Sequence, residues 1–194
     1  MRNAAIVVAI GLTLANHGAF AARTDVIEGN TGSSVRLLVY EDLQCDDCAR
    51  FEAMLEQKIL PKYSSKIVIV HRDFPLAKHD WARQAAMAAR WVWQQDSVRG
   101  IQIRRELLSE QDHITSANLN TWLADFAGRN HLDPKAIVDS LKDPNLSALI
   151  DQDRQAAVAR GVTGTPTAYI GGVAFKDPII YEDLARALDD ALAK

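Results

Sequence analysis

The stretch EDLQCDDCARFE, residues 41–52, contains the only two cysteines of the chain, Cys45 and Cys48. A short β-prone run, residues 35–40, precedes it and is typical of a buried strand. Apolar residues then recur at steps of three and four positions, which predicts one face of a helix that ends near Pro61: Cys48, Phe51, Leu55 and Ile59. The two thiols therefore lie where a strand passes into a helix.

Cys45 is the cysteine that we expect to react. The first turn of a helix has free backbone N–H groups that stabilise an anion, so the Cys45 thiolate should form below its ordinary pKa. Cys48 follows one turn later, on the apolar face and within reach of a short disulfide, and would resolve a mixed disulfide formed at Cys45. Such a pair predicts thiol–disulfide exchange without an organic cofactor, because the two sulfurs carry the electrons.

Two other uses of the cysteine pair compete with this interpretation. A zinc site needs two further ligands, and none of the five histidines lies at a paired spacing, so we expect no metal. Inert core thiols are disfavoured, because a strand-to-helix junction is poorly placed for filling a core. The alternative that stays open is a non-catalytic protein of the same fold that binds peptides or a soft metal ion.

Composition and the first residues limit the classes of protein to which this chain can belong. The 194 residues are 48% hydrophobic and carry a net charge of −3 without long charged runs, which argues against nucleic acid and against a basic membrane surface. Residues 1–21 have an early Arg2, an apolar run over 4–15 and small residues at 19 and 21 in an A-x-A pattern, the layout of a signal peptide. We therefore expect a periplasmic or secreted protein.

The order of the remaining patterns predicts the architecture. Residues 22–34 are polar and should form a flexible lead-in. Residues 35–75 and 161–194 carry strand–helix–strand and strand–strand–helix patterns, which suit a mixed sheet flanked by helices in an α/β fold. Residues 76–160 should form an inserted helical subdomain, with Asp–Pro pairs at two of its helix starts, Asp133 and Asp143.

A second stretch, GVTGTPTAYI at residues 161–170, supports the redox interpretation. Proline is poorly tolerated inside a sheet, so Pro166 should lie at the start of a strand. A cis turn there could bring the backbone of Thr165 beside the cysteines. Those backbone groups could then pair with an extended substrate peptide, as in strand addition.

Three segments together carry a resemblance to a known family: YEDLQCDDC, HRDFPLAKHDWARQAAMAAR and GVTGTPTAYIGG. The chain resembles the DsbA-like branch of the thioredoxin superfamily, exported thiol–disulfide oxidoreductases with an inserted helical domain. The resemblance implies a thioredoxin-like fold, Cys45 as the attacking cysteine, Cys48 as its partner, and a substrate-holding loop at Thr165 and Pro166. It also implies that His79 and Trp81 serve packing.

The acidic residues around the cysteines depart from that family's pattern. Members often have a carboxylate six residues before the first cysteine, where this chain has Val39, and strand alternation places Glu41 on the same face. Two further acids, Asp46 and Asp47, lie between the cysteines. Each should stabilise the helix, through its dipole, by a few tenths to about one kcal/mol. The same negative charges disfavour a Cys45 thiolate.

We expect these two acids, together with Glu41 and Asp42, to tune the Cys45 pKa and to make a weaker oxidant than the strong members of the family. The competing interpretation is solvated acids with no redox role. The expected substrates are protein thiols or disulfides, with a membrane or soluble redox partner, no nucleic acid, and a monomeric protein.

Overall fold

A computed structural model describes residues 25–194 of the chain. The expected signal peptide, residues 1–21, lies outside the described residues, and so do residues 22–24. Within the described part, no helix combines the length and apolar character needed to cross a membrane.

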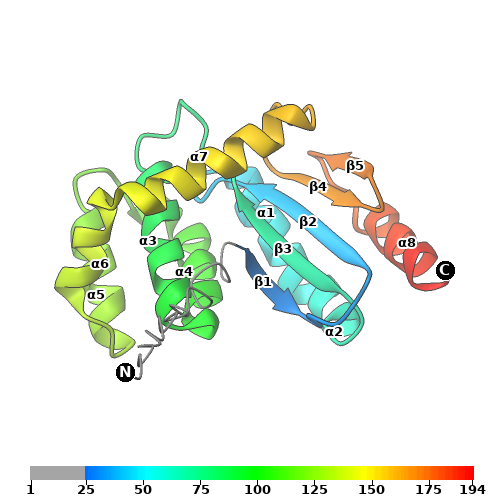
Figure 1. Ribbon diagram of the computed structural model, residues 1–194, viewed down its shortest axis with the longest axis horizontal. Coiled ribbons are helices and arrows are strands. Elements are labelled where there is room, and N and C mark those ends of the chain that lie inside the picture. Colours follow the sequence, from blue (N-terminus) through cyan, green and yellow to red (C-terminus); the bar gives the residue numbers. More distant parts are fainter. Residues whose placement is uncertain (1–24) are drawn as a thin grey trace, which may run out of the picture.

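Five strands form one mixed sheet in the order β1-β3-β2-β4-β5 (Figure 1). The strands are β1 Val26–Gly29, β2 Arg36–Glu41, β3 Val68–Asp73, β4 Thr167–Ile170 and β5 Val173–Lys176. The central pair, β2 and β3, is parallel, whereas β1 runs antiparallel to β3, β4 to β2, and β5 to β4. The expected mixed sheet is confirmed.

The prediction of a flexible lead-in over residues 22–34 is wrong at residues 26–29, which form strand β1. Residues 26–29 pair with β3 in the register Ile27↔Val70. Val26 is fully buried and packs with Trp93 and Ile101 of the helical insertion. The polar residues around this strand hid it, because only two apolar side chains mark it in the sequence.

The helix after the cysteines continues further than expected. Its segments are α1 Asp46–Met54, a π-helical turn Leu55–Ile59, and α2 Leu60–Tyr63. Pro61 was expected to end the helix, but it lies in the first turn of α2, where a proline N–H is not needed. The wide π-helical turn, in which the Leu60 N–H donates to the Leu55 carbonyl, lets the helix pass the proline.

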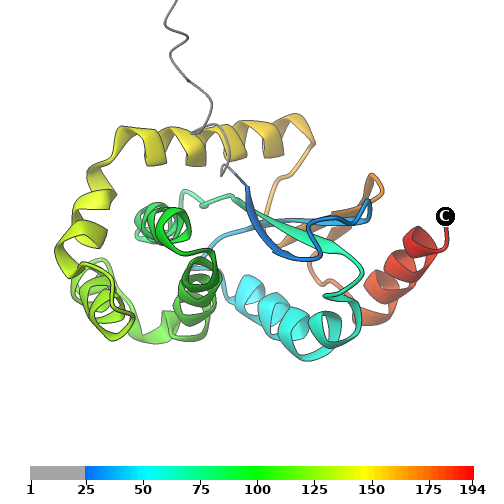
Figure 2. The ribbon, with the colours of Figure 1, turned by 60° about the horizontal axis from the view of Figure 1, so that its bottom comes forward.

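Helices cover both faces of the sheet (Figure 2). One face packs on α1, α2 and the C-terminal helix α8, Tyr181–Leu192, through a core that includes Val39, Leu55 and Leu188. The other face packs on α7, Pro144–Ala159, through Tyr40, Phe74 and Ala157. The strands alternate as the sequence predicts, since Val39 and Tyr40 belong to opposite cores.

The remaining helices form a block beside the sheet, and α7 links that block to the sheet (Figure 1). They are α3 Ala82–Gln95, α4 Ser97–Ser109, α5 Leu119–Arg129 and α6 Pro134–Asp139, with short 3₁₀ turns at Gln111–His113 and Ser140–Lys142. Asp133 and Asp143 cap α6 and α7 as expected, each with proline in the first turn. The division into a sheet domain and a helical insertion over residues 76–160 stays a prediction.

Helix α4 was not marked by apolar spacing in the sequence. Its buried face includes Arg104, which is 3% exposed and pairs with acids of the sheet. A buried charge interrupts the apolar period on which such a prediction depends. The tertiary structure supplies the acids that make the burial of an arginine tolerable.

Candidate active site

Cys45 lies at the start of α1, between β2 and the first helical turn. It occupies the N-cap position with extended backbone angles, φ −98° and ψ 121°. Its partner Cys48 is one turn further along, and both are free thiols in this structure. Cys45 is 6% exposed and Cys48 1% exposed, so the sulfur expected to attack is the more accessible of the two.

The surroundings of Cys48 differ from expectation. The sequence places Cys48 on one helix face with Phe51 and Leu55. In the structure, Phe51 and Leu55 pack under the sheet, whereas both cysteines join the core of the helical insertion with Trp81. Steps of three and four residues drift around a helix, so α1 divides its apolar residues between two cores. The cysteine pair therefore lies at the junction of the sheet and the helical block.

The loop before β4 meets the cysteines across 120 positions of sequence. The Thr165–Pro166 peptide bond is cis. The Cys45 thiol donates to the Thr165 carbonyl oxygen, with 3.6 Å between Sγ and O. The structure thus brings Thr165 and Pro166 beside Cys45, and their role in holding a substrate stays a prediction.

The pKa values of the two thiols are shifted in opposite directions. A hydrogen bond from Cys48 lowers the pKa of Cys45 to about 6, against the effect of burial, and a hydrogen bond from the backbone N–H of Cys48 adds to the lowering. Burial raises the pKa of Cys48 well above its ordinary value. At neutral pH the pair therefore holds a thiolate at Cys45 and a thiol at Cys48, the state that thiol–disulfide exchange requires.

Of the four acids predicted to tune Cys45, Asp42 has the most direct contact with the cysteine pair. It is buried, and its backbone N–H donates to the Cys48 sulfur, with 3.4 Å between N and Sγ. Its charge raises the pKa of Cys45. Strand alternation places Glu41, and not Asp42, on the face of Val39. Asp42 lies directly after β2, which ends at Glu41.

The two acids between the cysteines lie in the first turn of α1. Asp46 is exposed and makes no ion pair among the described residues, whereas Asp47 pairs with Arg50. Neither is among the main influences on the Cys45 pKa, which are hydrogen bonds, burial and Asp42. Tuning by Asp46 and Asp47 stays a prediction, and the two now differ in how far their charges are offset.

Glu41 belongs to a buried ionic cluster instead of the cysteine pair. It accepts from His71 at 2.8 Å (Oε1 to Nδ1) and from Arg104 at 2.7 Å (Oε1 to Nη2). Burial opposes its ionisation, but Arg104 and His71 lower the pKa of Glu41 to about 2. A carboxylate that stays ionised at neutral pH is poorly suited to pass a proton to a buried thiol.

Glu52 is the buried acid that sequence reasoning missed. It lies on α1, four residues after Cys48, and burial raises its pKa to about 7. The spacing of four residues was a usable signal, because it places Glu52 one turn beyond Cys48 on a neighbouring part of the helix surface. Its charge is met by Arg105, whose Nε lies 2.8 Å from Oε1 of Glu52.

Ligand atoms of Glu41, Glu52 and His71 lie within 4.8 Å of one another, a distance compatible with a bound metal ion. The contacts of these residues do not suit one. Both His71 ring nitrogens face carboxylates, Glu41 and Glu28, at 2.8 and 3.0 Å. With Arg104 on Glu41 and Arg105 on Glu52, cationic side chains of the protein already occupy the positions that a metal ion would take.

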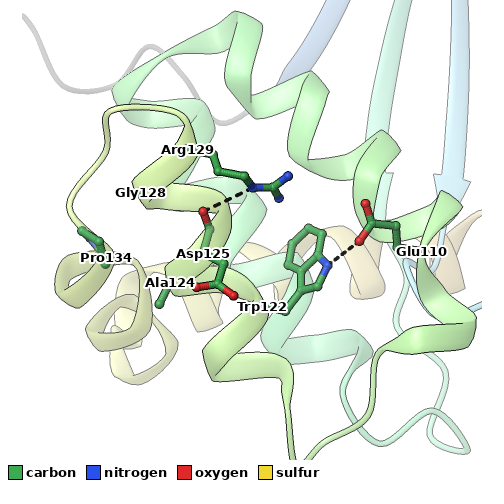
Figure 3. A pocket seen from close by; sticks show the side chains of 7 residues that line it. All are labelled: Glu110, Trp122, Ala124, Asp125, Gly128, Arg129 and Pro134. Carbon is green, nitrogen blue, oxygen red and sulfur yellow. Dashed lines mark hydrogen bonds between the residues drawn. The ribbon is translucent and has the colours of Figure 1, made fainter.

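A cavity of about 690 Å³ lies on the helical insertion (Figure 3). Trp122 and Asp125 of α5 line it with Glu110, and the Trp122 indole donates to Glu110 at 2.8 Å (Nε1 to Oε2). None of the predicted site residues lines it. The candidate site is thus defined by the cysteines and the Pro166 loop, and not by the size of a cavity.

His79, for which the resemblance implies a packing role, also contacts the cysteine site. It lies in the loop before α3, which begins at Ala82. Its Nδ1 lies 2.8 Å from Oδ2 of Asp42. Trp81, in contrast, is buried in the core of the helical insertion as expected.

Comparison with known proteins gives the same fold. A protein-family model for thioredoxin matches residues 21–190. The chain is 30% identical over 170 residues to the Na(+)/H(+) antiporter NhaA 3 of Salinispora tropica, covering 87% of this chain and 25% of the antiporter. It is 28% identical over 172 residues to a Rickettsia prowazekii protein provisionally named protein-disulfide oxidoreductase, covering 87% of this chain and 61% of that protein.

Solved structures share the architecture at lower identity. BdbD of Bacillus subtilis superposes with a TM-score of 0.80 at 17% identity, covering 88% of this chain and 94% of BdbD. The alpha-DsbA1 protein of Wolbachia pipientis gives 0.76 at 20%, covering 87% and 91%. A periplasmic thioredoxin-like protein of Salmonella enterica serovar Typhimurium gives 0.75 at 20%, covering 90% and 94%. At these identities the likeness establishes the shared fold.

Proposed function

This chain belongs to the thioredoxin family, and on that premise we propose that it is a DsbA-like thiol–disulfide oxidoreductase that acts on protein thiols and disulfides through Cys45 and Cys48. One observation carries the proposal. The low-pKa thiol at the start of α1 lies 3.6 Å from the carbonyl oxygen of Thr165, directly before the cis Pro166, with a buried second thiol one turn away. The chain spans 25% and 61% of the relatives it matches, so this activity is proposed for the chain itself.

The exchange proceeds in two balanced steps. A substrate thiolate attacks Sγ of Cys45 in the oxidised protein, forming a mixed disulfide and breaking the Cys45–Cys48 bond, and Cys48 leaves as a thiolate that takes up a proton. A second substrate thiolate then attacks the substrate sulfur and releases Cys45 as a thiolate. The substrate loses two electrons and the cysteine pair gains them; the reverse sequence reduces a substrate disulfide.

The Thr165 carbonyl gives the substrate a place to bind. In the reduced thiol form this oxygen accepts from Cys45. A thiolate or a disulfide sulfur has no proton to donate, so in those states the carbonyl is available to a backbone N–H of an extended substrate. Strand addition beside Pro166 would then align the substrate sulfur with Cys45.

The acidity of Cys45 bears on the direction of exchange. A thiolate stabilised in the reduced protein makes its disulfide a stronger oxidant. The Cys45 pKa of about 6 lies between reference values of about 7 for thioredoxin and about 3.5 for DsbA. We therefore expect a reduction potential between their values of about −270 and −120 mV, that of a moderate oxidant.

Turnover by three forms of the protein tests the proposal. The oxidised wild-type protein should form disulfides in a reduced, unfolded substrate, and Cys45→Ser should abolish this turnover. Cys48→Ala, given a substrate that already carries a disulfide, should accumulate a mixed disulfide, because the Cys45 thiolate attacks the substrate disulfide, releases one substrate thiolate and is left without Cys48 to resolve the adduct. A Cys45→Ser protein that still holds peptide, alongside a wild type without turnover, would favour the alternative, a non-catalytic peptide-binding protein.

Location and partners follow from the same proposal. The signal-like pattern of residues 1–21 and the periplasmic Salmonella neighbour support an exported protein, in which a membrane or soluble redox partner restores the cysteine pair. Fractionation of cells that produce the full chain would test this location. The expected monomer stays a prediction, measurable by light scattering.

A further inference from the structure

Asp42 is the acid with most contacts at the cysteine site. Its Oδ1 accepts from the Gln44 N–H at 2.7 Å, and its Oδ2 accepts from the Leu76 N–H at 2.7 Å. Its own N–H contacts the Cys48 sulfur, and its carbonyl accepts from the Cys45 N–H at 3.1 Å. The carboxylate is thus held rigidly three residues before Cys45, where its negative charge disfavours the thiolate.

Within residues 25–194, His79 is the ionisable side chain that contacts that carboxylate. Its Nδ1 lies 2.8 Å from Oδ2 of Asp42, and because a carboxylate can only accept, Nδ1 must donate. The imidazole is 14% exposed, so it can exchange protons with solvent.

The other charged groups around this loop have partners or lie in solvent. Asp80 accepts from Gln44 and Ser116, and Lys78 is exposed. From α7, Arg154 donates to the Pro75 carbonyl and lies over the Phe74 ring at 5.3 Å. The remaining titratable groups that share Asp42 as a neighbour are the two active-site cysteines.

We propose that His79 is a positioning residue for the redox reaction, which fixes the Asp42 carboxylate and, when protonated, offsets the negative charge that Asp42 places beside Cys45. The inference rests on the proposed function, since it assigns His79 a role in stabilising the reactive thiolate. Protonation of His79 makes the reduced form more stable and the disulfide more oxidising; its deprotonation leaves the Asp42 charge opposed to the thiolate.

The thiolate of Cys45, followed by its ultraviolet absorbance as a function of pH, tests the proposal directly. His79→Asn keeps a donor near the Nδ1 position but cannot carry a charge, whereas His79→Ala loses both. Near pH 6 we expect about three-fold less Cys45 thiolate in His79→Asn than in the wild type, with the difference closing as pH rises. His113→Asn, a change of an exposed histidine on the helical insertion, is the matched control and should leave the titration unchanged.

A double-mutant cycle separates action through Asp42 from general scaffolding. Asp42→Asn alone should increase the thiolate fraction, and His79→Asn should then have almost no further effect in that background. An equal effect in both backgrounds, or an unchanged titration in His79→Asn, would overturn the proposal. The titration reads Cys45 whether or not substrate turns over, so its outcome is independent of the oxidoreductase assay, and folding of each variant is checked by its Tm.

Discussion

At the scale of single residues, the chemistry of the site depends on two sulfurs of different acidity. Cys45 has its pKa lowered to about 6, chiefly by a hydrogen bond from Cys48, and Cys48 has its own raised by burial. The backbone N–H groups at the start of α1 and the charge of Asp42 act in opposite directions on the same thiolate. Small changes of charge here should therefore have measurable effects on the thiolate.

The two aspartates between the cysteines should be unequal. Asp47 pairs with Arg50, whereas Asp46 is exposed and makes no ion pair within residues 25–194. Asp46→Asn should therefore lower the Cys45 pKa by roughly 0.1–0.7, and Asp47→Asn by less, because the interaction of two solvent-screened charges is worth about 0.2–1 kcal/mol. Thiolate absorbance against pH measures both.

Arg50→Gln serves as the control for this comparison, since it frees the Asp47 charge and should raise the Cys45 pKa. Identical titrations of Asp46→Asn and the wild type would mean that solvent screens the aspartates completely, which is the interpretation without a redox role.

At the scale of elements, a buried histidine ties three neighbouring strands together. His71 of β3 contacts Glu28 of β1 at 3.0 Å through Nε2 and Glu41 of β2 at 2.8 Å through Nδ1. In the sheet register, Val26 and Val39 lie opposite His71, so each glutamate is a diagonal neighbour on the same face. These two ion pairs, the His71 cluster, therefore join β1, β3 and β2 beside the cysteine site.

The free energy of unfolding should depend on the charge of His71 in this cluster. Burial alone would lower the pKa of His71, but Glu41 and Glu28 raise it to about 10, from an ordinary value of 6.5. Because the folded pKa is the higher one, the stabilisation is complete below about pH 6.5 and is lost as pH rises through about 10. His71→Gln should lower the free energy of unfolding at pH 6 by on the order of 3–5 kcal/mol.

Denaturant unfolding of His71→Gln and wild type across this pH range measures the difference, which should shrink towards pH 10. His113→Gln is the matched control, since that imidazole is exposed. A difference that stays constant with pH would mean that shape, and not the charge of His71, accounts for the loss.

At the scale of the whole molecule, buried ion pairs join the helical insertion to the sheet. Arg90 of α3 donates to Asp73 of β3 at 2.6 Å (Nε to Oδ2) and also pairs with Asp153 of α7. Arg104 of α4 pairs with Glu41 and Asp73 at 2.7 and 2.8 Å. Since the cysteines lie at the same junction, the position of the helices over the site depends on these pairs.

Removal of Arg90 should therefore destabilise the whole protein. Arg90→Met keeps much of the side-chain volume but leaves Asp73 and Asp153 buried without this cation, which should cost about 3–5 kcal/mol of unfolding free energy. Denaturant unfolding followed by circular dichroism measures the loss.

Arg129→Gln is the control for Arg90→Met, because the Arg129 side chain is 57% exposed and its pair with Glu106 should contribute below about 1 kcal/mol. Equal losses in the two variants would show that burial does not distinguish the two ion pairs.

Much of the fold was predictable because its signals are local. Adjacent glycines, Gly171 and Gly172, predict the β4–β5 hairpin, and both adopt positive φ, at 55° and 88°. The proline-linked caps of α6 and α7 and the period of apolar residues in α8 depend on near neighbours in the chain. The Cys45–Cys48 pair could be recognised for the same reason, because its two signals are also local. The cysteines are three positions apart, and they lie at the start of a helix.

Only the tertiary structure decided what surrounds that pair. The contact of Cys45 with Thr165 joins positions 120 apart, and Asp42 meets His79 across 37 positions. The buried arginine of α4 and the charge on His71 depend likewise on acids from distant strands. A charge is tolerated in a core only when a partner from elsewhere in the fold meets it. Local patterns therefore determined which atoms react, whereas packing between distant segments determined how acidic those atoms are.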